Sequence, residues 1–148
     1  MTALGDFSPG DVLTAADLNA LPGGVKARAT STTSGTTASN PQLTTSFTAV
    51  IGRLYRITYY EGAAQSPAGA GNYVSLVIKD GATGLSLGQS QASGATQVAN
   101  TVNVQWIGTL SAGSHTINAD ANANTGTTNL YRSASLVSFL LVEDIGPA

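Results

Sequence analysis

HTINADANA, residues 115–123, is the stretch of the sequence that indicates the fold class most clearly. Its apolar and polar side chains alternate without interruption, which is typical of a β-strand buried on one face only. The residues expected on the buried face are Ile117, Ala119, Ala121 and Ala123, and those on the opposite face are Thr116, Asn118, Asp120, Asn122 and Asn124.

Other short runs with apolar residues in alternating positions precede and follow this stretch. An Asp80–Gly81 turn should join the run that ends there to GLSLGQS as a hairpin. Connections rich in Gly and Ser separate about eight strands, a pattern that predicts an all-β antiparallel sandwich or jelly roll. The runs are VKARATSTT (25–33), QLTTSFTAVI (42–51), RLYRITYYEG (53–62), NYVSLVIKDG (72–81), TQVANTVNVQWIGTL (96–110) and SASLVSFLLVED (133–144).

The last of these runs is apolar on both faces of the strand that it predicts. Such a strand lies in the centre of a sheet, or one of its faces is covered by another subunit. Val137, Phe139 and Leu141 are therefore candidates for an oligomer interface.

The beginning of the chain differs from the β-rich body. Within LGDFSPGDVLTAADLNALPGG (4–24), Thr14 is a good N-cap, and Leu13 and Leu18 form a hydrophobic staple around it. Pro22 to Gly24 should end the helix and leave a flexible joint. We therefore expect an arm with a short helix over 1–24 and a β-body over 25–148.

A helix of about two turns is marginal in water and needs a surface to lie on. The surface belongs either to the protein's own body or to a neighbouring protein, and the second reading is preferred. The apolar residues that would make the contact are Phe7, Val12, Leu13, Leu18 and Leu21.

Composition limits the function classes. The 148 residues suffice for one domain. Only 9% of them are charged and the net charge is −2, so the chain lacks the basic surface that nucleic-acid binding requires. There is no cysteine and no apolar run long enough to span a bilayer. Few charges also favour stable association with partners or with further copies.

The ionisable residues do not suggest an enzyme. His115 is the only histidine, and it lies beside a predicted turn, where an exposed or hydrogen-bonded role is expected. Glu143 and Asp144 are adjacent and should face opposite ways on a strand, so they cannot form a catalytic pair. We therefore expect no catalytic residues. The other carboxylates of the body are Glu61, Asp80 and Asp120.

Two loop patterns resemble ligand sites only superficially. DANANTG (120–126) has oxygen-bearing residues at alternate positions, but Thr125 and Tyr131 stand where a calcium loop needs Gly and Glu. The glycines in 69–73 lack the Lys and the following helix of a phosphate-binding loop. No metal or cofactor site is predicted.

The aromatic residues offer an alternative of another class, a carbohydrate-binding adhesin. Exposed aromatic rings could stack on a sugar. However, Trp106 lies within an alternating apolar strand, where core packing is the commoner role. The remaining candidates are Tyr55, Tyr59, Tyr60, Tyr73 and Tyr131.

Several phrases resemble proteins of tailed phages. FSPGDVLTAADLNAL (7–21) is similar to N-terminal segments of virion proteins, especially minor tail and fibre-type proteins. GRLYRITYY (52–60), LSAGSHTINADA (110–121) and LLVEDIGP (140–147) resemble small β-domains from phages of actinobacteria.

This resemblance implies a virion structural protein, commonly a trimer with a sandwich or jelly-roll-like body and an N-terminal attachment arm. Together with the arm, it predicts a capsid decoration protein on the capsid surface that docks on the major capsid protein. A minor tail protein, or a head or tail fibre component, is the nearest alternative.

Overall fold

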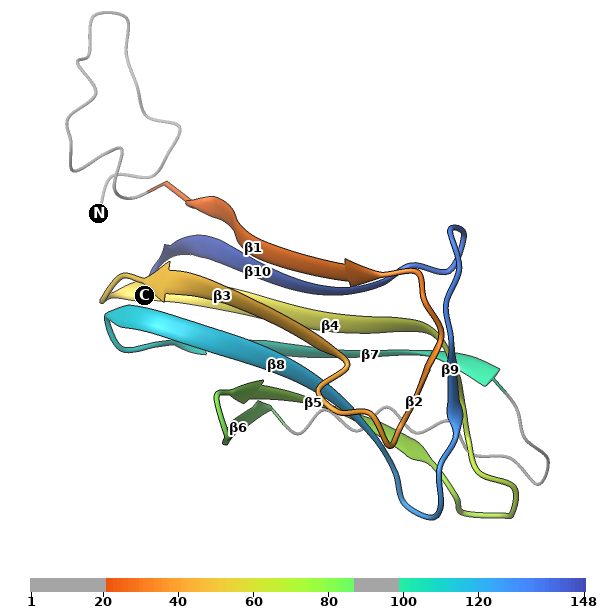
Figure 1. Cartoon of the computed structure of the whole chain (residues 1–148). Helices are drawn as coiled ribbons and strands as arrows, with labels where there is room; N and C mark the ends of the chain where they lie inside the picture. The colour runs from red at the N-terminus through yellow and green to blue at the C-terminus, as the bar shows by residue number, and fades with distance from the viewer. Residues whose placement is uncertain (1–20, 87–98) are drawn as a thin grey trace, which may run out of the picture.

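The computed structural model describes residues 21–86 and 99–148, and the regular elements in these ranges are all β-strands (Figure 1). The predicted helix lies outside the described residues. The strands are β1 (Gly24–Ser31), β2 (Gly35–Thr36), β3 (Leu43–Ala49), β4 (Arg53–Gln65), β5 (Val74–Asp80), β6 (Thr83–Ser86), β7 (Ala99–Thr109), β8 (Gly113–Ala123), β9 (Asn129–Tyr131) and β10 (Ser138–Pro147).

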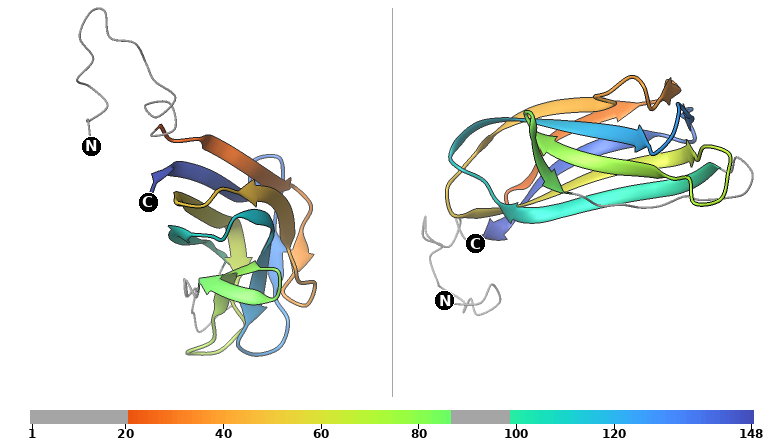
Figure 2. Two further views of the ribbon diagram at one scale, coloured as in Figure 1. Left: turned by 90° about the vertical axis from the view of Figure 1, so that its left-hand side faces the viewer. Right: turned by 90° about the horizontal axis from the view of Figure 1, so that it is seen from below.

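The strands form two antiparallel sheets that face each other. The first has the order β1-β10-β4-β9-β2, and β7 also pairs with β4. The second has the order β3-β8-β5-β6. Figure 2 shows the two layers in views along and across the strands. The predicted all-β, antiparallel, sandwich-like architecture is therefore confirmed.

The core lies between the sheets and is built by the alternation seen in the sequence. On β4, Tyr55, Ile57 and Tyr59 stand at alternate positions and are fully buried. They belong to one hydrophobic cluster with Ile117 and Ala119 of β8. The remaining members of that cluster include Leu43, Phe47, Val74, Leu76, Ile78, Ala121, Val102, Val104, Leu130, Leu140 and Val142.

The β5–β6 hairpin forms at the predicted turn. Asp80 pairs with Thr83, and Gly81 adopts a φ of 58°, which costs a glycine little because it has no Cβ. The Gly81 N–H also donates to the Thr116 carbonyl oxygen over 2.8 Å, which ties the hairpin to β8.

Strand β10 is central, as one of the two readings of its sequence predicts. It pairs with β1 on one side and with β4 on the other. Leu140 and Val142 point into the core, while Phe139 and Leu141 are half-buried on the outer face of the sheet. The first and last strands of the body thus lie side by side, with Gly24 opposite Asp144 (Figure 1).

Candidate functional site at the root of the N-terminal arm

Leu21, the first described residue of the predicted arm, lies next to the end of β10. Arg53, the first residue of β4, donates from Nη2 to the Leu21 carbonyl oxygen over 2.6 Å. The same guanidinium binds Asp144 of β10, with Nε 3.0 Å from each carboxylate oxygen and Nη2 2.7 Å from Oδ1. The Asp144 side chain is only 5% exposed, so solvent screens this pair less than a surface pair. Arg53 therefore fixes the end of the arm to two central strands.

Asp144 collects further donors around the same point. The Gly146 N–H lies 3.1 Å from its Oδ1, and the Lys26 Nζ lies 3.9 Å from its Oδ2. Burial alone would raise the pKa of Asp144, but hydrogen bonds from Arg53, Gly146 and the backbone of Gly23 outweigh it and hold that pKa below its usual value. The carboxylate is therefore ionised at neutral pH, and its ion pair with Arg53 is formed.

The absence of a side chain at Gly23 leaves room for this carboxylate. A Cβ at residue 23 would lie 2.5 Å from the Asp144 Oδ2 and 2.8 Å from the Lys26 Nζ, closer than real side chains approach. Within the predicted joint, Pro22 to Gly24, the backbone of Gly23 contributes a hydrogen bond to Asp144. We call Leu21, Gly23, Arg53 and Asp144 the arm clamp.

An apolar groove of about 290 Å³ begins beside the arm clamp, on the outer face of the first sheet. We call it the outer groove, and it is lined by Val25, Arg28, Phe139 and Leu141. Val25 is 62% exposed. The Phe139 ring stacks on Tyr60 of β4 at a centroid distance of 5.1 Å. Apolar surface on the outside of a sheet is typical of a face that another chain covers.

The structure brings some of the predicted interface and arm residues together. Phe139 and Leu141 share the outer groove, whereas Val137 precedes β10 and does not line the groove. Leu21 is half-buried and belongs to the arm clamp. The other predicted arm residues lie outside the described ranges; they are Phe7, Val12, Leu13 and Leu18.

His115 is a buried residue at the start of β8, and both of its ring nitrogens are hydrogen-bonded. Of the two expected roles, exposed or hydrogen-bonded, the hydrogen-bonded one is confirmed and the exposed one is wrong. Its Nδ1 lies 2.6 Å from the Asp80 Oδ2 and its Nε2 lies 2.8 Å from the Ser111 carbonyl oxygen. These two acceptors, the Ser111 carbonyl first, raise the pKa of His115 above its usual value. The residue therefore connects two turns.

The residues of the rejected calcium pattern bind other parts of the protein. Asp120 pairs with Lys79. The Asn122 Oδ1 accepts a hydrogen bond from Asn40 over 2.8 Å, and the Asn124 Oδ1 accepts one from the Tyr73 N–H over 2.8 Å. Within 21–86 and 99–148 no group of three or more His, Asp or Glu side chains could hold a metal ion. No helix in these ranges is long and apolar enough to cross a membrane.

The aromatic residues do not gather into one exposed platform. Tyr55 and Tyr59 are fully buried in the core, so neither is available to stack on a sugar. Trp106 packs against the core from β7, as expected. Tyr60 is half-buried against Phe139, and Tyr131 is exposed on β9.

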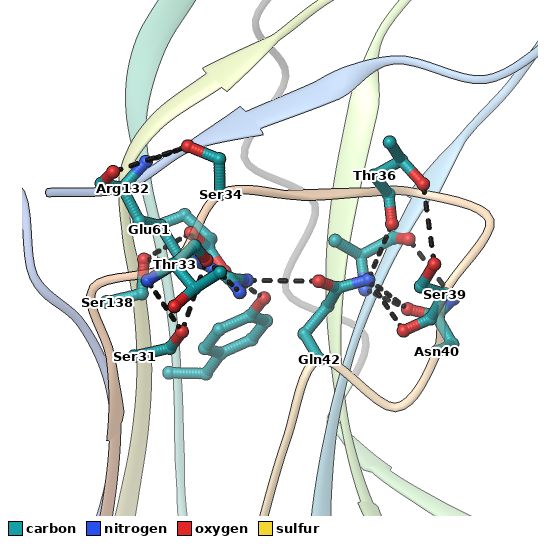
Figure 3. A network of polar contacts seen from close by, with 12 residues as sticks. Ser31, Thr33, Ser34, Thr36, Ser39, Asn40, Gln42, Glu61, Arg132 and Ser138 are labelled. Carbon is teal, nitrogen blue, oxygen red and sulfur yellow. Dashed lines mark hydrogen bonds and ion pairs between the residues drawn. The ribbon is translucent and has the colours of Figure 1, made fainter.

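A buried polar network was missed by sequence reasoning (Figure 3). The Arg132 guanidinium binds both carboxylate oxygens of Glu61, with Nε 3.1 Å from Oε2, and it also donates to the Ser138 hydroxyl oxygen over 3.1 Å. The Tyr59 hydroxyl donates to the Glu61 Oε1 over 2.6 Å, and burial raises the pKa of that hydroxyl. Arg132 reaches the Gln42 Oε1 over 3.0 Å.

This network ties β4 to β10 and to the segments before β3 and after β9. The Glu61 and Arg132 side chains are both almost fully buried, so each charge depends on the other for stability. Glu61 continues the inward alternation of Tyr55, Ile57 and Tyr59, a signal that could have placed it in the core.

The arm clamp and the outer groove both lie on the first sheet, and the buried network lies near the other end of β4. Comparison with known proteins finds no family model that matches the sequence and no matching curated protein.

Proposed function

We propose that the protein is a non-enzymatic structural protein of a tailed-phage virion, a capsid decoration protein that docks on the major capsid protein through residues 1–24. The observation that carries the proposal is the arm clamp. Arg53 and Asp144 connect the root of an apolar peptide to β4 and β10, the two central strands of the first sheet.

This connection suits a decoration protein that is held on the capsid by its N-terminal arm. A pull on the arm would load not only β1, the edge strand that follows the arm in the chain, but also β4 and β10, which Arg53 and Asp144 connect to Leu21. Docking would gain about 25 cal/mol per Å² of apolar surface buried, less the free energy of ordering the arm.

The outer groove supports the second part of the proposal, a trimer. Phe139, Leu141 and Val25 would be covered by a neighbouring copy, and the scarcity of charge on the chain makes such association less costly. A trimer carries three arms, so after one arm docks the others bind at a high effective concentration.

The attachment is tested by deleting residues 1–20 and measuring occupancy on particles that lack the protein, with immunogold labelling in the electron microscope. The truncated chain keeps the arm clamp and should fold like the full chain, but should no longer decorate the particles. Decoration at full occupancy by the truncated chain would overturn the proposal, as would labelling of the full chain at the tail alone.

The trimer is tested separately with Leu141→Asp in the outer groove. The full chain should elute as a trimer in light-scattering chromatography, and the variant should elute as a folded monomer because a carboxylate would be buried in the interface. Thr109→Asp, at an exposed position of β7, is the control and should stay trimeric. A monomeric full chain, or a trimeric Leu141→Asp variant, would contradict this part of the proposal.

A further inference from the structure

A second pocket lies on the outer face of the other sheet. It has a volume of about 240 Å³ and is formed by the loop before β3, the β5–β6 turn and the strands β5 and β8. We call it the polar pocket, and its lining residues are Asn40, Pro41, Lys79, Gly81, Ala82, Asn118 and Asp120.

Asp120 is the central group of this pocket. It is only 6% exposed although it faces outward from β8, and one of its carboxylate oxygens pairs with the Lys79 ammonium. No hydrogen bond from the part of the chain that the structure describes reaches its other oxygen, Oδ1. The largely buried Asp120 carboxylate therefore lines the pocket with one oxygen that can still accept a hydrogen bond. The Lys79 ammonium beside it has N–H groups that can still donate.

The walls of the pocket are held in place by their own hydrogen bonds. The Asn40 amide bonds the Ala121 carbonyl oxygen over 3.1 Å and the Ala121 N–H over 3.0 Å, so it is fixed across the end of β8. The Asn118 Nδ2 donates to the Gly81 carbonyl oxygen over 3.0 Å, and its Oδ1 accepts from the Thr44 hydroxyl over 2.9 Å. A ligand would meet polar groups that are already oriented, which lowers the entropic cost of binding.

The charges of the pocket select the chemical class of the ligand. An anion would be attracted by Lys79 but repelled by Asp120, and a cation would experience the reverse. A hydroxyl group both donates and accepts, so neighbouring hydroxyls can satisfy the Asp120 Oδ1 and the Lys79 ammonium together. We propose that the polar pocket binds a neutral sugar ring, with two adjacent hydroxyls on Asp120 and Lys79 and a third group on Asn118.

The site is independent of the proposed attachment. The polar pocket lies on the outer face of the second sheet and the outer groove on that of the first, so a protein docked and assembled through the first sheet would still present the pocket. The polar face continues beyond the pocket, where the Ser46 and Thr116 hydroxyls lie 3.1 Å apart. A longer glycan could follow this face.

The test uses the full chain on a glycan array, followed by saturation-transfer NMR with the neutral sugars that bind. Asp120→Asn keeps the shape of the side chain but removes its charge, and Ala82→Trp fills the pocket from an exposed turn position without touching the ion pair. Each should weaken binding at least about tenfold, or roughly 1.4 kcal/mol. Thr48→Ala, exposed on β3 outside the pocket, is the control and should bind like the unchanged protein.

The absence of binding to every neutral glycan of the array and to free monosaccharides at millimolar concentration would overturn the proposal. Sugar binding that survives both Ala82→Trp and Asp120→Asn would place the ligand elsewhere and would overturn it equally. Because Ala82 takes no part in the ion pair, this variant keeps the test valid even if Asp120→Asn fails to fold.

Discussion

Glu61 and Arg132 show how a protein with few charges places two of them in its interior. They lie 71 residues apart in the sequence and meet at the end of the core, where Ser138 and Tyr59 bind the same carboxylate. Alternation along β4 is enough to predict that Glu61 points inward. Its partner is not predictable in this way, because the contact depends on how β4, β9 and β10 come together and not on local periodicity.

Arg132→Met should destabilise the protein by about 3–5 kcal/mol, because it leaves the Glu61 carboxylate buried without its counter-charge. Urea unfolding followed by tryptophan fluorescence measures the loss. Arg56→Met is the control, since Arg56 pairs with Glu143 on the outer face of the sheet and its loss should leave the midpoint nearly unchanged. Equal midpoints for the two variants would contradict the role assigned to the buried pair.

Gly23 is a second residue whose importance is local and steric. Gly23→Ala should cost about 1–3 kcal/mol, because the added methyl group displaces the Asp144 carboxylate from the arm clamp. Gly84→Ala in β6 is the matched control, since a Cβ there meets no atom within 4 Å. Thermal unfolding of both variants compares them directly. A Gly23→Ala variant as stable as the control would show that the clamp tolerates a side chain.

At the scale of elements, the sequence predicts strands and turns better than it predicts their partners. The β5–β6 hairpin and the buried faces of β4 and β8 follow from Asp80–Gly81 and from period-two alternation, because these signals are local. The pairing of β1 with β10 joins the two ends of the body, and β2 and β9 are too short to show any periodicity. These pairings follow from packing of the whole chain.

The arm clamp illustrates the same limit at the candidate site. Pro22, Gly23 and Gly24 are read from sequence as a flexible joint, since glycine lowers the cost of many backbone conformations. In the structure Gly23 also lets Asp144 approach the backbone. This close approach follows from the pairing of Gly24 with Asp144. The two residues lie near opposite ends of the sequence of the body, so no local pattern predicts their pairing.

His115 links the β5–β6 turn to the β7–β8 turn, and the link should depend on pH. Both ring nitrogens face acceptor oxygens, so the link is complete only when the imidazole is doubly protonated. Its folded-state pKa is raised above the usual 6.5, so the stabilisation is fully present below pH 6.5 and is lost as the pH rises through the folded pKa.

Proton NMR can follow this titration without assignment, because the chain has one histidine. The ring signal should titrate above pH 6.5, and the melting temperature should fall over the same range. In Asp80→Asn the midpoint should move down, because the neutral amide no longer stabilises the imidazolium. A midpoint at or below 6.5 in the unchanged protein would contradict the link.

At the scale of the whole molecule, the two outer faces differ in chemistry. The first sheet presents an apolar groove with Phe139 and Leu141, and the second presents hydroxyl and amide groups around Asp120. The arm clamp and the Glu61–Arg132 network lie near opposite ends of β4 and β10 and connect these two strands at both ends. The difference between the two outer faces is what the proposed attachment at one end and cover of one face would require.

The place where the apolar side chains of the arm are buried decides whether the arm is a means of attachment. A photo-crosslinking amino acid at position 7, in place of Phe7, tests this directly when the labelled protein is bound to particles and irradiated. Mass spectrometry should then find the crosslink on the major capsid protein, as the proposed docking requires. Crosslinks confined to residues of the same subunit would contradict the account, because the arm would then be part of its own body and not a means of attachment.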